Sequence, residues 1–169
     1  MTEISFYFLA WLCWDSSITA KAAFQLYYTS LVYILVATSR TLPRLDQDNR
    51  FFWTAGARGE LQFLRCRECT AFVHPPRPVC RGCLSENVAP ETVAGTGVVD
   101  TFTINHQPWR EGLEVPYVIA RVAVDGAPGV YLTTNIVGSA VDAVKIGDRV
   151  RVTFEQHGEI FLPLFERMD

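Results

Sequence analysis

The sequence of 169 residues is long enough for one ordinary domain or two small ones. Hydrophobic residues make up 49% of it and charged residues 20%, a composition that supports a packed core and excludes a wholly disordered chain. The net charge of −3 does not favour a general nucleic-acid-binding protein, because such domains are usually basic.

Residues 1–40 form an apolar N-terminal extension, in which the stretch from Ala22 to Ser39 carries no charge. This stretch barely reaches the length of a membrane span, and polar residues dilute it. A signal peptide would begin with basic residues, but Glu3 is the only charged side chain before Asp15. Three interpretations stay open: a helical addition that packs on a partner, a weak membrane anchor, or translated upstream sequence that is not native. We favour the first or the third, and we expect a cytoplasmic protein without a membrane partner.

Residues 41–60 predict a short aromatic helix after the break at Leu42-Pro43-Arg44. Asp46 and Asp48 are candidate caps for its beginning, and Gly56 or Gly59 suits its end. The helix carries three adjacent aromatic residues, which cannot all face one side: Phe51, Phe52 and Trp53. At least one of them should contact something beyond the helix's own core face, either the segment that follows or another chain.

Residues 61–90 hold four of the five cysteines, in two C-x-x-C pairs with ten residues between the pairs: Cys66, Cys69, Cys80 and Cys83. This pattern is typical of a rubredoxin-like zinc ribbon, in which four thiolates complete a tetrahedron and leave the metal no open position. Disulfides would require an oxidising compartment, and a redox C-x-x-C usually occurs once, near a βαβ pattern that this sequence lacks. The fifth cysteine, Cys13, is best interpreted as a buried apolar thiol. The sequence therefore predicts one structural Zn2+.

The rest of the ribbon segment predicts two strands and a basic surface. Residues 61–65 predict a strand that leads into the first cysteine pair, and residues 71–74 predict its return. His74 is a possible ligand, but with four cysteines present a turn-stabilising or surface role is the better interpretation. Five arginines and two glutamates give residues 58–81 a net charge of +3. Four of the arginines either meet phosphate groups or an acidic partner, or merely solvate a small metal module: Arg65, Arg67, Arg77 and Arg81.

Residues 91–169 follow a β pattern. Strands are predicted at 98–104, 117–124, 130–137, 150–154 and 160–165, with a longer connection between the third and the fourth. Gly95-Thr96-Gly97 interrupts the pattern and suits a bulge or a sharp coil. Five strands of this length predict a compact Greek-key barrel of the OB type. The chain is therefore predicted to be mainly β, with helices only near its N-terminus.

The sequence offers no evident catalytic group. A nucleophile with a base and an orienting carboxylate is not apparent, because zinc takes the paired cysteines and no GxSxG, P-loop or GxGxxG motif occurs. Among the histidines, His157 precedes a predicted hairpin turn at Gly158. His106 begins a loop with Trp109 that ends at Tyr117 and is a candidate lining for a ligand, although a plain loop residue is the better interpretation of His106.

The order of these features resembles the zinc-ribbon, acyl-CoA-associated OB-fold family, which was long known only as a domain of unknown function. The resemblance covers roughly residues 41–169, and residues 1–40 depart from it. It rests on an ordered set of short matches: Asn49-Arg50-Phe51-Phe52-Trp53, Gly59-Glu60-Leu61, Cys66-Arg67-Glu68-Cys69, His74-Pro75-Pro76-Arg77, Gly95-Thr96-Gly97, Thr101-Phe102-Thr103, Val115-Pro116-Tyr117, Thr134-Asn135-Ile136-Val137 and Ile146-Gly147-Asp148.

The resemblance implies an accessory subunit of thiolase-like, aldolase or hydratase enzymes in acyl-CoA, steroid side-chain or polyketide metabolism. Its OB fold would help to hold or channel the CoA thioester, with the nucleophile on the partner. We therefore expect a hetero-oligomer in which the aromatic helix anchors the partner through Phe51, Phe52 and Trp53. The contacts expected with CoA or the partner come from Arg65, Arg67, Arg77, Arg81, His106, Trp109 and Tyr117.

Two other classes of function stay open. Zinc ribbons and OB barrels both bind single-stranded nucleic acid, which makes such a module the main alternative. A stand-alone lyase or hydrolase would need turnover by the purified chain, and we expect none. Whether the chain takes part in catalysis with a partner is not fixed by the sequence.

Overall fold

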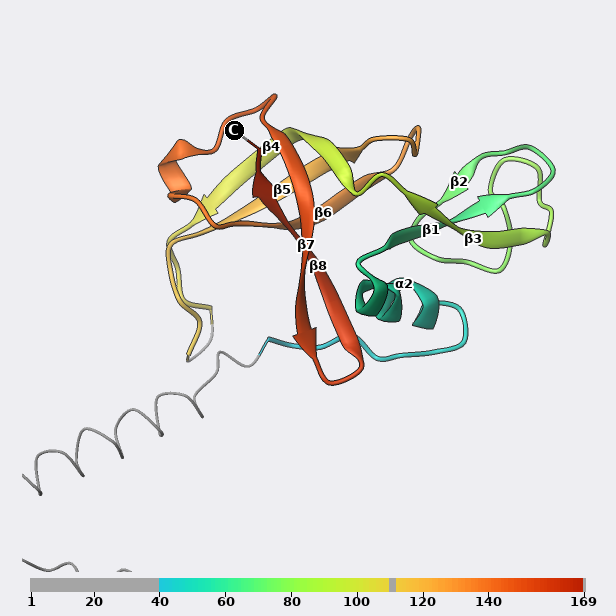
Figure 1. Ribbon diagram of the computed structural model, residues 1–169, viewed down its shortest axis with the longest axis horizontal. Coiled ribbons are helices and arrows are strands. Elements are labelled where there is room, and N and C mark those ends of the chain that lie inside the picture. Colours follow the sequence, from blue (N-terminus) through green and yellow to red (C-terminus); the bar gives the residue numbers. More distant parts are fainter. Residues whose placement is uncertain (1–39, 110–111, 169) are drawn as a thin grey trace, which may run out of the picture. The chain divides into compact units, whose positions relative to one another are not determined.

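The computed structural model describes residues 40–109 and 112–168 (Figure 1). Apart from Arg40, the N-terminal extension lies outside these ranges, and so does Cys13, so the interpretations placed on them fall on residues that the structure does not describe. Within the two described ranges, no helix combines the length and the apolar character needed to cross a membrane. The elements are, in chain order, α2 (Arg50–Thr54), η1 (Ala55–Arg58), β1 (Leu61–Cys66), β2 (Phe72–Val73), β3 (Val88–Val93), β4 (Thr96–Asn105), β5 (Tyr117–Val124), β6 (Tyr131–Val137), η2 (Val141–Ala143), β7 (Arg149–His157) and β8 (Ile160–Arg167).

The aromatic helix forms as predicted, as α2 followed directly by the 3-10 helix η1. The prediction of its cap was wrong, because the N-cap is Asn49 and its side chain makes no capping bond. Asp46 instead organises the turn before the helix, where its carboxylate accepts hydrogen bonds from the backbone N–H groups of Asp48 (3.0 Å) and Asn49 (2.9 Å). Gly59 ends η1 with a φ of 70°, a left-handed conformation that costs glycine no steric strain.

The three aromatic residues of α2 are used inside the chain. Phe52 is 3% exposed, and its ring centroid lies 5.9 Å from that of Phe63 in β1. Phe51 and Trp53 are half-buried against the same core, and Phe51 also packs against the ribbon. Phe51 thus makes the predicted contact with the segment that follows the helix. Burial leaves Phe52 no surface for the partner contact that the sequence analysis assigned to it.

The ribbon is a three-stranded antiparallel sheet in the order β2-β1-β3. Six register pairs join β1 to β3, from Leu61 opposite Val93 to Cys66 opposite Val88. The sequence analysis did not predict β3, which contains Pro90. A proline removes one backbone donor, and it is tolerated here because β3 lies at the edge of the sheet.

The barrel contains the five predicted strands, paired in the order β4-β5-β6-β8-β7, with β7 returning to β4 through three register pairs. Of the bulge or sharp coil expected at the glycines, the structure has the coil, since Gly95 lies with a left-handed φ of 68° between β3 and β4. The irregularity in β4 falls further on, between Val99 and Thr101. Gly97 serves a close approach instead, since a Cβ there would lie 2.5 Å from the carbonyl oxygen of Ala123. The interior is filled by side chains that are at most 1% exposed, among them Val99, Val118, Ala120, Val122, Val150 and Phe165.

The aromatic helix is docked closely on the β7–β8 hairpin. A Cβ on Gly56 would lie 2.4 Å from the Cβ of Phe161 and 2.6 Å from a ring carbon of Phe154. Only a residue without a side chain permits this approach. The contact positions Phe52 and β1, and with them the ribbon, on the barrel's core.

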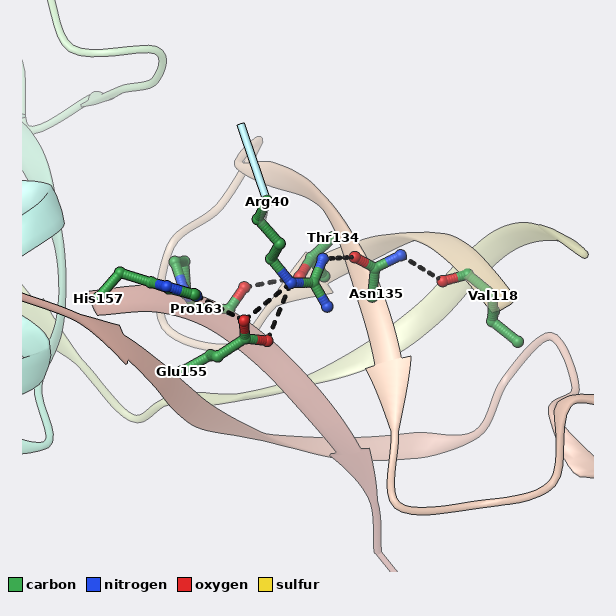
Figure 2. Close-up of polar contacts among 7 residues, drawn as sticks. All are labelled: Arg40, Val118, Thr134, Asn135, Glu155, His157 and Pro163. Carbon is green, nitrogen blue, oxygen red and sulfur yellow. Dashed lines mark hydrogen bonds and ion pairs between the residues drawn. The ribbon is translucent and has the colours of Figure 1, made fainter. Parts of the chain in front are cut away.

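The parallel pairing of β6 with β8 is short, with only two register pairs, and side chains continue it (Figure 2). Pro163 has no N–H to donate to β6, but its carbonyl accepts a hydrogen bond from Oγ1 of Thr134 at 2.6 Å. Arg40 then joins β7 to β6, because Nε donates to both carboxylate oxygens of Glu155 (3.0 and 2.9 Å) and Nη1 donates to Oδ1 of Asn135 (2.9 Å). Side-chain hydrogen bonds thus replace the missing ladder at this seam.

Candidate metal centre

Two similar turns carry the four cysteines, and we name residues 66–70 the first knuckle and residues 80–84 the second knuckle. In each, the N–H of the first cysteine donates to the carbonyl five residues further on, at 2.9 Å in both cases. The residue that follows each cysteine pair, Thr70 or Leu84, has a left-handed φ of 62°. The same backbone course in both turns directs the four thiols toward one centre.

The four sulfur atoms lie within 4.8 Å of one another. Two of the separations are 3.5 Å, between the sulfurs of Cys66 and Cys83 and between those of Cys69 and Cys80. Tetrahedral zinc with Zn–S bonds of about 2.3 Å separates its sulfurs by about 3.8 Å, whereas a disulfide brings them to about 2.05 Å. The residues present therefore fit a four-coordinate zinc ion, which would have no position left for water or substrate.

The electrostatics of the sulfurs also suit a cation. The backbone N–H of Cys69 is the main group that lowers the pKa of Cys66, to about 7. The N–H of Ser85 acts in the same direction on Cys83, but the nearby sulfurs of Cys69 and Cys66 outweigh it and raise the pKa of Cys83 to about 12. A divalent cation at the centre would offset this crowding of negative charge. Bound zinc would stabilise the folded ribbon. With four protein ligands it would have no open position from which to act as a Lewis acid.

The four ribbon arginines separate into two pairs. Arg65 and Arg67 both bind Glu91 of β3, with Nη1 of Arg65 2.6 Å from one carboxylate oxygen and Nη1 of Arg67 3.3 Å from the other. Arg77 and Arg81 are exposed, and they form no hydrogen bond or ion pair with any residue that the structure describes. The free positive charge of the ribbon is therefore concentrated at and before the second knuckle.

His74 lies in a bend directly before Pro75, it is too buried for the surface role that the sequence suggested, and it is not among the residues grouped around the metal centre. Its half-buried ring packs edge-on against Phe63, with centroids 5.0 Å apart, and lies 5.4 Å from the ring of Phe52. Burial lowers the pKa of His74, and its buried Nδ1 has no hydrogen-bond partner. It is a neutral member of the aromatic core.

The loop between β4 and β5 brings the remaining candidate residues to one end of the barrel. Trp109 is 75% exposed, and its indole N–H donates to Oδ1 of Asn105 at 2.9 Å. Asn105 is itself held by a bond from its Nδ2 to the carbonyl of Gln107 (2.7 Å). His106 is exposed, and Tyr117 is half-buried at the start of β5, opposite Asn105. The tryptophan is thus oriented by its neighbours while its ring faces solvent.

Sequence reasoning missed three features of the surface. Glu91 neutralises two arginines, but its position follows from β3, which was not predicted. Leu84 is 77% exposed, and its place directly after the second cysteine pair was a usable signal. The hydrogen bond between Glu155 and Nε2 of His157, at 2.6 Å, belongs to the group that Arg40 joins, and only the hairpin spacing hinted at it.

The fold and the four-sulfur centre together define a zinc-ribbon protein with an OB-type barrel. A family model described as "ChsH2, rubredoxin-like zinc ribbon domain" matches residues 53–89, and one described as "ChsH2, C-terminal OB-fold domain" matches residues 90–155. The chain belongs to this ChsH2, or DUF35, family.

Three relatives place the chain within the family. It is 36% identical over 127 residues to a probable enoyl-CoA hydratase alpha subunit of Thermomonospora curvata, covering 75% of this chain and 39% of that one. It is 31% identical over 112 residues to the 3-oxo-4,17-pregnadiene-20-carboxyl-CoA hydratase alpha subunit of Mycobacterium tuberculosis, covering 66% and 35%. It therefore spans little more than a third of the length of these two proteins. The solved "Ltp2-ChsH2(DUF35) aldolase" matches with a TM-score of 0.67 and 34% identity, over 75% of this chain and 98% of that one.

Proposed function

We propose that this chain is an accessory subunit that binds a thiolase-like, aldolase or hydratase partner and helps to hold or channel an acyl-CoA thioester. The observation that carries the proposal is the match to a DUF35 chain from an Ltp2–ChsH2 aldolase, which extends over 98% of that chain. This chain therefore matches nearly the whole length of a chain from a solved aldolase. The two hydratase alpha subunits support the same class of substrate, a CoA thioester.

The chemistry of the described residues agrees with a supporting role. Every cysteine that the structure describes belongs to the metal centre. The Glu155 carboxylate beside His157 is already engaged by Arg40, and no free thiol stands near them among the described residues. The reacting nucleophile would then come from the partner.

The packed barrel supports a particular location for the thioester. Side chains that are at most 1% exposed fill the barrel interior, so an acyl chain has no room inside it. The thioester would instead lie on the outside of the barrel, between the β4–β5 loop and the partner. The exposed ring of Trp109 supplies an apolar surface there.

Reconstitution tests the proposal. The purified intact chain would be mixed with Ltp2, the subunit named in the matching aldolase structure, and aldol cleavage of an acyl-CoA would be measured with each protein alone and with both. We expect complex formation, activity in the mixture, and no turnover by this chain alone. A chain that stays monomeric and leaves Ltp2 unchanged would refute the accessory role.

Nucleic-acid binding has less support. The exposed arginines of the barrel are largely paired, as Arg121 is with Asp100 and Arg149 with Asp125. A groove for single strands needs free positive charge beside exposed aromatic rings. A salt-dependent mobility shift with a single-stranded oligonucleotide would favour this alternative, and no shift at low salt would exclude it.

A further inference from the structure

The two knuckles share one backbone course but present different surfaces. After the first cysteine pair the left-handed position holds Thr70, and the nearby arginines are neutralised by Glu91. After the second pair the same position holds Leu84, which at 77% is the most exposed large apolar side chain among the described residues. Contacts within the ribbon therefore account for the charged residues near the first knuckle, but they do not account for the exposed Leu84 of the second knuckle.

Leucine is an unfavourable choice at this position on two counts. A left-handed φ strains an L-residue that carries a Cβ, and glycine would avoid this strain. The side chain also remains in water and gains nothing from burial within the chain. A contact that buries Leu84 outside the chain would compensate for both costs.

The charge around Leu84 indicates what would cover it. Arg81 lies within the second knuckle and Arg77 precedes it, and neither has a partner among the described residues. Glu86 is the nearest acidic residue in the sequence after the knuckle, so the segment stays net positive. A protein surface with an apolar pocket rimmed by carboxylates would pair with both arginines and bury the leucine.

We propose that the second knuckle is the docking tip for an acidic, apolar-pocketed surface of the catalytic partner subunit, with Leu84 as the buried anchor and with Arg77 and Arg81 as its charged rim. This inference rests on the proposed function, since the partner is the thiolase-like, aldolase or hydratase subunit. It also replaces Phe52, which is buried, as the expected anchor.

Leu84→Gly separates docking from folding. Glycine relieves the left-handed strain, so zinc content is preserved and the melting temperature of the chain alone is unchanged or higher. Removal of the anchor raises the Kd for Ltp2 about 10-fold or more, as measured by calorimetry with the intact chain. Thr70→Gly is the matched control at the equivalent position of the first knuckle, and it leaves the Kd unchanged.

A charge series completes the test. Arg77→Glu with Arg81→Glu should weaken Ltp2 binding and reverse its dependence on salt, because carboxylates would then face carboxylates and added salt would screen their repulsion. Lys145→Glu with Ile146→Ser removes an exposed cation and an exposed aliphatic from a barrel turn, and it serves as the control that keeps full affinity.

The outcomes are distinguishable from those of the proposed function. If the unmodified chain does not bind Ltp2, the accessory role itself fails. If it binds and Leu84→Gly binds equally well, the docking tip is wrong while the accessory role stands. If the arginine variants lose zinc but keep partner affinity, the arginines serve only to balance the charge of the thiolate centre, and the inference is overturned. If the unmodified chain binds a single-stranded oligonucleotide and the variant with Arg77→Glu and Arg81→Glu does not, the inference is overturned as well.

Discussion

At the scale of single residues, His74 has the clearest solution consequence. Its ring packs against Phe52 and Phe63, and its Nδ1 is buried without a partner. Burial lowers the pKa of His74 below the value of 6.5 that an unfolded chain would have. The unfolded state therefore binds a proton first as the pH falls. The free energy of unfolding should decrease as the pH drops below about 6.5, and the loss should be complete below the lowered pKa of the folded state.

The variant His74→Phe removes this titration and keeps an aromatic ring in the core. We expect its free energy of unfolding to be less sensitive to pH between pH 7.5 and 5.5, measured by urea denaturation with excess zinc. His106→Phe changes an exposed histidine of the β4–β5 loop and is the matched control, with the pH dependence of the unmodified chain. Equal slopes for the unmodified chain and His74→Phe would contradict the assignment.

At the scale of elements, we expect the ribbon to depend on the metal for its stability more than the barrel does. The ribbon's own apolar cluster is small and consists of Leu64, Cys66, Val73 and Cys80, two of which are the sulfur ligands themselves. The barrel strands have a separate core, which also takes up Phe63 from β1. Structural zinc contributes about 10–16 kcal/mol in isolated finger peptides, far more than four small side chains supply.

Chelation should therefore unfold the ribbon alone. We expect EDTA, or the ligand variant Cys69→Ser, to abolish protection of the β1–β2 amides against hydrogen exchange while the amides of β4 to β8 stay protected. Cys69 is the suitable ligand to change, because it is exposed and its loss removes little packing. Global unfolding of the barrel on chelation would mean that the two parts share one cooperative core.

The elements also show which structural features the sequence could predict. Among the barrel strands, β7 alternates apolar and polar residues clearly, whereas β5 and β8 are mostly apolar runs. The turn residues that bound these segments, together with their apolar and β-branched content, were enough to predict all five strands. Pro90 lies in the middle of β3, and no local pattern of residues marks this segment as a strand. The strand β3 forms because β1 offers an unpaired edge, which is tertiary information.

The candidate site divides in the same way. The metal centre was predictable because two C-x-x-C pairs are a local signal that fixes geometry directly. The roles of the arginines were not, because Arg65 and Arg67 find Glu91 only through the register of β1 with β3. Nor could adjacency along α2 tell that Phe52 is buried while Phe51 reaches the ribbon.

At the scale of the whole molecule, the filled barrel constrains where a thioester can lie. OB barrels bind ligands on their outer face and loops, and the exposed Trp109 stands in the loop between β4 and β5. If the acyl chain lies on this outer surface, changes in the interior should alter stability without altering substrate preference. Changes on the loop should alter substrate preference without altering stability.

Two variants test this separation in the complex with Ltp2. Val122→Ala removes two methyl groups from a fully buried position, so we expect a loss of about 1.5–3 kcal/mol in the free energy of unfolding and an unchanged acyl-chain preference at a permissive temperature. Trp109→Ala should leave the melting temperature intact and raise the KM for acyl-CoA about 5-fold or more, because its ring is exposed and is oriented by a hydrogen bond to Asn105. If Val122→Ala instead shifted the preference toward longer acyl chains, the thioester would have to enter the barrel, and the outer surface would lose its assigned role.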